Sequence, residues 1–142
     1  MSALTLDLAR TCIARGIKEA ERLGFKVAIA VVDDAGHLMA CERMDGALWV
    51  TPEVARAKAN AAAAFRTTTL DLEERFNKGR QLFASNVATL GDYAFVFGRG
   101  AVPIVEGGQV VGAVGVSGAV PADNDHTIAD EAAGHPELPT SH

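Results

Sequence analysis

Side chains suited to acid–base chemistry and metal binding gather near the C-terminal end of the chain. Ser117 stands between two glycines, and Asp125 and His126 follow at the start of a predicted helix. A histidine beside a carboxylate can move protons near neutral pH, and its imidazole can ligate iron. We therefore predict Asp125 and His126 as catalytic residues, His126 also as a metal ligand, and Ser117 as a ligand-binding residue. The alternative for His126 is a solvated position in the first helical turn.

A second candidate group, Arg43-Met44-Asp45-Gly46, ends a predicted strand. The planar guanidinium of Arg43 can hold a carboxylate through two parallel hydrogen bonds, which makes Arg43 a candidate ligand-binding residue. Asp45 can orient Arg43, cap the turn or act as a base, and we include it as a candidate catalytic residue. The alternative is a loop ion pair with a turn aspartate.

Lys58 lies in an unusually small segment, AKANAAAAF. It can lie exposed on a polar helix face with Arg56 and Asn60, or it can point into a cavity with its amine partly desolvated. Desolvation favours the neutral amine, which suits a lysine to catalysis or to anion binding. Lys58 is therefore a third candidate ligand-binding residue, and both interpretations stay open.

Several familiar motifs are missing from the sequence. The glycines of the segment GAVGVSG lack the GxGxxG spacing of dinucleotide-binding turns, and no P-loop sequence occurs. The four histidines form neither HxH nor HExxH, so we expect no preformed zinc site. The residues around Ser117, GVSGA, differ from the GxSxG elbow of hydrolases.

The charge and hydropathy of the chain limit the classes of partner that we expect it to bind. With 13 Lys and Arg against 18 Asp and Glu, the formal net charge is −5, whereas non-specific nucleic-acid binding needs a basic face. No run approaches the ~18 apolar residues of a membrane span, and no signal peptide is visible. Cys12 and Cys41 lack metal-like spacing, and we interpret both as buried, reduced thiols of a cytoplasmic protein. We expect a small-molecule ligand, and no nucleic-acid or membrane partner.

Helical and strand periodicities define the first third of the chain. Apolar residues at helical spacing predict a helix over residues 5–24, with Thr5 as N-cap and Gly24 at its end. A continuous apolar run predicts a buried strand over residues 26–33, and a turn leads to a returning strand over residues 37–43.

The middle of the chain is predicted to be helical. Thr51 as N-cap and Pro52 at the first helical position begin a helix that runs to about Phe65. Thr69, followed by acidic residues, begins one or two short helices over residues 70–90.

A short strand over residues 93–97, a hairpin and a last helix complete the pattern. The hairpin joins strands over residues 103–105 and 110–116 through the turn EGGQ, and the helix covers about residues 122–133. Helices that cover an antiparallel sheet give an α+β fold, here with five strands.

Gly112 and Gly115 interrupt the second strand of this hairpin. Glycine in a strand often marks a bulge or the close approach of a ligand or another backbone. Both a tightly packed central strand and a ligand site fit the spacing.

Six segments together are similar to one known family. They are LTLDLA (residues 4–9), AVVDDAGHL (30–38), RMDGA (43–47), the helix residues 55–65, GAVPIVEGGQVVGAVGVSGA (100–119) and DND (123–125). On these segments the chain resembles the GlcG/HbpS-like family of small haem-associated proteins, which in turn resembles the C-terminal domain of PduO-type cobalamin adenosyltransferases.

The resemblance implies a profilin-like α/β/α arrangement with a five-stranded antiparallel sheet. It implies a single GlcG/HbpS-like domain over residues 1–134, which leaves residues 135–142 as a flexible C-terminal tail, and it implies a homo-oligomer. The alanine-rich helix and the strand VVGAVGV would then serve as packing surfaces between copies.

Two functions follow as hypotheses. The first, implied by the resemblance, is a protein that binds haem or degrades it, with Arg43 or Lys58 pairing a propionate and His126 near the iron. The second is a cofactor-independent lyase, hydrolase or isomerase that acts on a small anionic or carbonyl-bearing metabolite in a catabolic pathway. In that case Asp45, Asp125 or His126 would move a proton.

Overall fold

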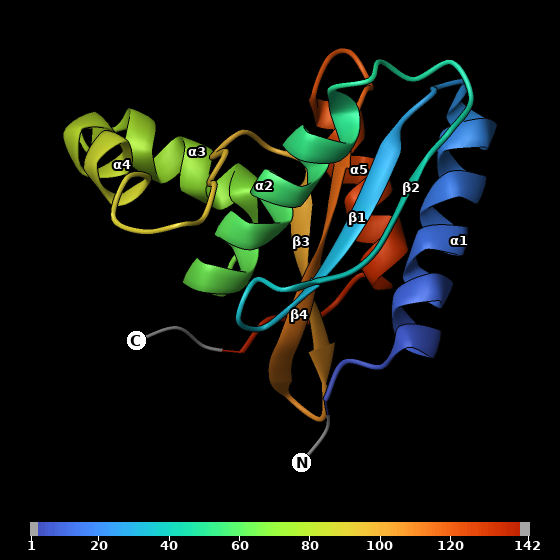
Figure 1. Cartoon of the computed structure of the whole chain (residues 1–142), viewed down its shortest axis with the longest axis horizontal. Helices are drawn as coiled ribbons and strands as arrows, with labels where there is room; N and C mark the ends of the chain where they lie inside the picture. The colour runs from blue at the N-terminus through green and yellow to red at the C-terminus, as the bar shows by residue number, and fades with distance from the viewer. Residues whose placement is uncertain (1–2, 140–142) are drawn as a thin grey trace.

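A four-stranded antiparallel sheet forms the centre of the structure (Figure 1). The computed structural model describes residues 3–139. Its strands are β1 (Ala28–Asp33), β2 (Leu38–Arg43), β3 (Ala101–Glu106) and β4 (Gln109–Ser117). In the order β2-β1-β4-β3, the buried strands β1 and β4 lie in the middle and the largely exposed β2 forms one edge.

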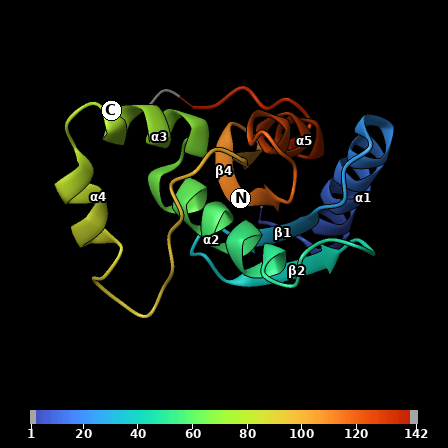
Figure 2. The ribbon, with the colours of Figure 1, turned by 90° about the horizontal axis from the view of Figure 1, so that it is seen from above.

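Helices cover both faces of this sheet. They are α1 (Leu6–Leu23), α2 (Thr51–Phe65), α3 (Thr69–Asn77), α4 (Gln81–Val87) and α5 (Asp123–Ala133). α1 and α5 pack together on one face and α2 packs on the other, while α3 and α4 extend to the side (Figures 1 and 2). The predicted α+β class is confirmed, with helices in layers on either side of the sheet.

Local signals placed the first helix and both hairpins correctly. The Thr5 side chain accepts a hydrogen bond from the backbone N–H of Leu8, and Gly24 ends α1 in the left-handed conformation at φ 85°. Gly107 and Gly108 both have positive φ, at 59° and 77°, which suits the two-residue turn between β3 and β4.

The predicted fifth strand over residues 93–97 is wrong, because this segment runs along α2 instead of joining the sheet. The backbone N–H of Val96 donates to the carbonyl of Ala57 in α2 at 3.3 Å. Phe97 packs edge-to-face on Phe76, with ring centroids 4.9 Å apart. Burial of these rings against the helices therefore decides the path of the segment, rather than strand pairing.

Two helix starts differ from the prediction by one residue. Thr51 is the first residue of α2 and not its N-cap. Thr68, not Thr69, caps α3 by accepting from the N–H of Asp71 at 3.1 Å. Thr69 is buried, and its hydroxyl oxygen accepts from the N–H of Ala101 at 2.8 Å. The second threonine thus ties α3 to the start of β3.

The glycines of β4 serve close packing. A Cβ on Gly115 would lie 2.0 Å from the carbonyl oxygen of Ala55, and one on Gly112 would lie 2.2 Å from that of Val32. Both distances are far below van der Waals contact, so β4 can lie against α2 and β1 only with glycine at these positions. The alanine face of α2 and the strand VVGAVGV are buried within the chain, so neither is the surface between copies that we expected.

Two further expectations concern the C-terminal tail and the absence of a membrane-spanning helix. Residues 140–142 of the predicted flexible tail lie outside the described residues, and its flexibility stays a prediction. Within residues 3–139, none of the helices combines the length and the apolar character that crossing a membrane requires.

Candidate functional site

A cleft of about 1240 Å³ lies between α2, the hairpin of β1 and β2, and the loop after α4. Its volume exceeds the roughly 300–1,000 Å³ that is typical of small-molecule sites. The hairpin contributes residues 34–38 and Cys41, and the loop contributes Val87 and residues 91–95. One side of α2 forms the third wall, so the cleft needs all three segments to be in place.

Aromatic rings line the end of the cleft near the C-terminus of α2. Phe65, Tyr93 and Phe95 belong to its wall, with centroids 4.5 Å apart for Tyr93 and Phe95 and 5.9 Å apart for Phe65 and Phe95. Phe65 and Phe95 also belong to the aromatic cluster that packs residues 95–97 against α2. A flat apolar ligand could therefore stack or pack against this wall.

Asn60 places an unpartnered polar atom beside the cleft. Its side chain is buried with 9% exposure, and its amide nitrogen donates to the carbonyl of Ala94 at 3.4 Å. Its Oδ1 has no hydrogen-bond partner. A Cβ on Gly36 would lie 3.3 Å from this oxygen, so the hairpin turn packs closely over it. Because a buried acceptor without a donor is costly, Oδ1 is suited to a water molecule or a ligand.

The charges around the cleft are mainly negative. Asp34, Glu53 and Asp92 line it, against the single guanidinium of Arg56. Arg56 is exposed and forms no ion pair with any residue that the structure describes. A small multiply charged anion would thus meet repulsion over most of the wall, whereas one carboxylate of a larger ligand could pair with Arg56.

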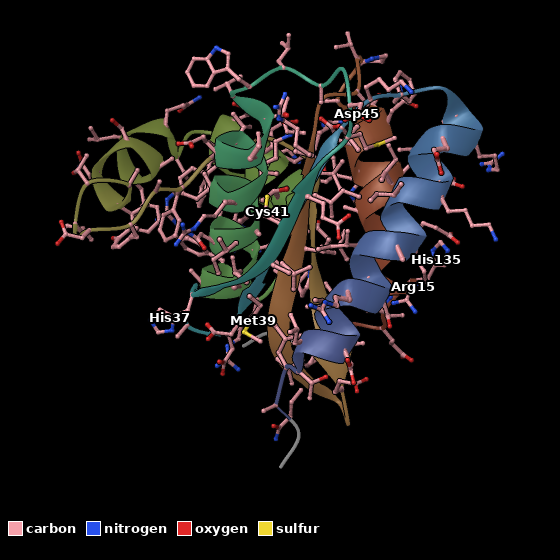
Figure 3. All side chains as sticks on the ribbon, turned by 45° about the vertical axis from the view of Figure 1, so that its right-hand side comes forward. Arg15, His37, Met39, Cys41, Asp45 and His135 are labelled. Atoms are coloured by element: carbon pink, nitrogen blue, oxygen red, sulfur yellow. The ribbon has the colours of Figure 1, made fainter. Side chains whose placement is uncertain are left out.

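His37 is held at the mouth of the cleft by the turn that precedes it. Its Nδ1 lies 3.3 Å from Oδ2 of Asp33. The other oxygen of Asp33 accepts from the backbone N–H groups of Ala35 and His37, at 3.0 and 2.9 Å. Figure 3 shows His37 at the turn end of β2 and Cys41 farther along the strand, near α2.

Cys41 is exposed, so the prediction that both cysteines are buried is correct for Cys12 alone. Partial burial of the thiol nevertheless raises the pKa of Cys41, against the opposing charge of Arg56. The edge position of β2, which pairs with β1 alone among the described strands of the sheet, explains this exposure. The thiol therefore carries its proton at neutral pH and is a poor metal ligand there.

Lys58 is buried, so the interpretation that places it on a polar helix face is wrong. Its amine does not face a cavity either, since Nζ donates to Oδ2 of Asp125 at 3.2 Å and to the carbonyl of Val116 at 3.1 Å. A Cβ on Gly100 would lie 2.9 Å from Nζ, so this glycine leaves room for the lysine to reach across to α5. Burial raises the pKa of Asp125, and the Lys58 charge opposes this effect.

Asp125 in turn holds the loop between β4 and α5. Its Oδ1 accepts from the N–H of Ala119 at 2.9 Å. Ser117 is buried at the end of β4, and His126 is half-buried with an unpartnered Nδ1. The structure therefore brings Lys58 and Asp125 together in an ion pair that joins α2 to α5, at the end of β4 that carries Ser117.

The remaining two predicted residues lie at the end of β2 and in the loop after it, where Arg43 is two strands away from Ser117 with Ala28 paired between them. Arg43 is exposed and donates from Nη1 to the carbonyl of Ala47 at 2.8 Å, which closes the loop after β2. Asp45 is exposed in the same loop, at the end of β2 opposite His37 (Figure 3). None of the six predicted site residues lines the cleft, and their chemical roles stay predictions.

The sequence contained a signal for the cleft that the spacing arguments missed. Asp33 and His37 flank a tight turn, four residues apart, and a carboxylate at this spacing can orient an imidazole. Strand periodicity identified this segment only as the turn before the returning strand over residues 37–43. Asn60 and Tyr93 carry no local signal, because the cleft exists only once the loop has folded back on α2.

Comparison with known proteins shows which family the chain is similar to. Residues 4–134 match the family model described as haem degrading protein HbpS-like. Protein GlcG of Escherichia coli strain K12 is 40% identical over 116 residues, which cover 80% of this chain and 81% of that protein.

Two solved structures are also similar to the chain. A double mutant of Streptomyces reticuli HbpS has a TM-score of 0.83 and 28% identity, and the match covers 95% of this chain and 88% of HbpS. The complex of PduOC with haem has a TM-score of 0.83 and 26% identity, and the match covers 99% of this chain and all of PduOC, at 100%.

Proposed function

The chain belongs to the HbpS-like family, and from this premise we propose that it binds haem in the cleft between α2, the β1–β2 hairpin and the loop after α4. The observation that carries the proposal is the character of this cleft. It is larger than a typical small-molecule site and has an aromatic wall, and a buried acceptor without a partner lies beside the hairpin turn. A haem-bound relative with the same fold supports it.

The residues of the cleft fit an amphipathic macrocycle. Phe65, Tyr93 and Phe95 would contact its apolar face, and Arg56 would pair with one propionate at the mouth. Asn60 Oδ1 would accept a hydrogen bond from a water molecule enclosed with the ligand. When bound, haem supplies an iron centre whose reactivity depends on its axial ligand and on the polarity around it.

The charges of the cleft weigh against the alternative of a small anionic metabolite. Three carboxylates face the single guanidinium of Arg56, and the amine of Lys58 is already engaged by Asp125. Haem binding depends less on these charges than binding of a small anion does, because most of the binding free energy of haem comes from burial of apolar area. Degradation of haem and assembly into a homo-oligomer, which the resemblance implies, stay predictions.

Titration of the purified protein with haem, followed by the Soret band, tests the proposal. We expect Ala64→Trp to abolish binding, because Ala64 is an exposed cleft residue and the indole would fill the space without touching the core. Ala14→Trp, at an exposed position of α1, is the matched control and should bind as the wild type does. Equal binding by both variants would place haem elsewhere, and no spectral shift in the wild type would refute haem binding.

The contribution of Arg56 is tested in the same titration. Arg56→Ala should weaken haem binding by about fivefold at most, because an exposed ion pair contributes up to about 1 kcal/mol. Arg10→Ala removes an equally exposed guanidinium from α1 and should leave the affinity unchanged. The difference between the two variants should shrink at high salt, since screening weakens surface charges.

A further inference from the structure

The turn between β1 and β2 presents one imidazole, that of His37, to the cleft in a defined orientation. Asp33 is fixed in place, because its Oδ1 accepts from the backbone N–H groups of Ala35 and His37 at 3.0 and 2.9 Å. Its Oδ2 is left to face Nδ1 of His37 at 3.3 Å. Oδ2 is thus an acceptor aimed at one nitrogen of the ring.

The carboxylate of Asp33 receives two backbone hydrogen bonds on one oxygen. The N–H groups of Ala35 and His37 both donate to Oδ1, an arrangement that favours the charged form of the carboxylate. An ionised carboxylate can only accept hydrogen bonds, so it favours the tautomer of neutral His37 with the proton on Nδ1. Nε2 is then left with a free lone pair.

The other side chains of the cleft that can ligate iron are engaged or protonated. The Tyr93 hydroxyl donates to the carbonyl of Val87 at 2.7 Å. Partial burial raises the pKa of Cys41, so that its thiol keeps its proton. His126, the ligand predicted from the sequence, does not line the cleft. Among the described lining residues, His37 alone offers a free donor atom of the kind that haem iron takes.

We propose that His37 is the axial ligand of haem iron in the cleft, through Nε2, and that Asp33 is the positioning residue that fixes its tautomer. This inference rests on the proposed function. Carboxylates that accept from the second nitrogen of a ligating histidine orient the ring and raise its basicity, and their loss typically weakens metal binding by about 10- to 100-fold. The side chain of His37 is 80% exposed, so its replacement leaves the fold intact.

The test combines haem titration with spectroscopy of the loaded protein. His37→Gly should bind haem at least about tenfold more weakly, with a shifted Soret band, and free imidazole should restore the wild-type spectrum. His135→Ala removes an exposed histidine that does not line the cleft and is the matched control, and its spectrum and affinity should equal those of the wild type. His126→Ala tests the competing ligand. Circular dichroism of each variant separates loss of a ligand from loss of fold.

The role of Asp33 has a separate readout. In Asp33→Asn, the amide oxygen can still accept from the backbone N–H groups, but the amide nitrogen then faces Nδ1 and donates to it. The imidazole proton moves to Nε2, so haem affinity should fall by about 10- to 100-fold and the reduction potential of the bound haem should rise.

Each outcome of these titrations has a distinct meaning. An unchanged spectrum in His37→Gly, with wild-type binding intact, refutes the ligand assignment and leaves the cleft as the haem site. Loss of the spectrum in His126→Ala instead assigns the iron to the group at α5. An unchanged potential and affinity in Asp33→Asn would refute the positioning role. Absence of any wild-type spectral shift refutes the proposed function itself.

Discussion

Replacement of Lys58 by methionine tests whether the buried ion pair with Asp125 is part of the fold. Nζ and Oδ2 lie 3.2 Å apart, and both side chains are almost fully buried. At that separation, two unit charges attract by about 5 kcal/mol at an effective dielectric constant of ~20. Desolvation of the two groups opposes this attraction, but removal of one partner leaves the other charge buried alone, which typically costs about 3–5 kcal/mol.

We therefore expect Lys58→Met to lower the free energy of unfolding by about 3–5 kcal/mol at neutral pH, measured by urea denaturation. The exposed lysine of α1 supplies a control, and Lys18→Met should change the stability by less than about 0.5 kcal/mol. The double variant Lys58→Met/Asp125→Asn should recover most of the loss. Its asparagine carries no charge, and its carbonyl oxygen can still accept from the N–H of Ala119.

The pH dependence of the destabilisation in Lys58→Met distinguishes loss of the ion pair from simple loss of packing. Burial already raises the pKa of Asp125, and removal of the Lys58 charge, which opposes burial, raises it further. An acid whose pKa is raised on folding contributes stability below its unfolded pKa and loses it as the pH rises through the folded pKa. The destabilisation should thus shrink in mild acid. An equal loss at both pH values, or none at neutral pH, would refute the role of the charge pair.

Three further predictions concern the packing and the end of the last helix. Gly115→Ala places a methyl group 2.0 Å from the carbonyl oxygen of Ala55, so the urea midpoint should fall by an amount that corresponds to about 3 kcal/mol or more. Phe76→Ala removes a buried ring from the aromatic cluster, so the free energy of unfolding should fall by about 3–5 kcal/mol. Haem titration of the same variant should show weaker binding, because the aromatic wall of the cleft loses its support. Hydrogen bonds, first to Asp130 and then to Glu131, raise the pKa of His135 above 6.5. The charged imidazole therefore stabilises the fold fully below pH 6.5, and this stabilisation is lost as the pH rises through the raised pKa. The thermal unfolding temperature of His135→Ala should thus equal that of the wild type only at high pH.

Where periodicity was strong, the sequence predicted the elements to within a residue or two. The apolar spacing and caps of α1, the continuous apolar run of β1 and the paired glycines at the β3–β4 turn all act locally. Their effects on backbone conformation therefore do not depend on what packs against them. Gly115 was predicted only in part. Its place inside a strand indicated an unusual position, but a bound ligand and close packing explained it equally well.

The family of the chain was also readable from the sequence, because it rests on the residues themselves. The location of a site was not, because a site requires distances between segments far apart in the chain. Spacing alone could not show that Arg43 and Ser117 lie on either side of Ala28 at one end of the sheet, or that Lys58 and Asp125 meet in the interior. Lys58 proved to be buried because a glycine at position 100 leaves space for its amine to reach α5.

Only the tertiary structure decided where residues 93–97 run and hence that a cleft exists. A strand over residues 93–97 would have paired with the sheet. Packing of Phe95 against Phe65 holds the segment over α2 instead. That path brings Ala94 to Asn60 and completes a cleft whose lining also includes His37 of the β1–β2 turn. The residue types and the helix and strand periodicities were properties of the sequence, while their convergence on one cleft came from apolar burial between distant segments.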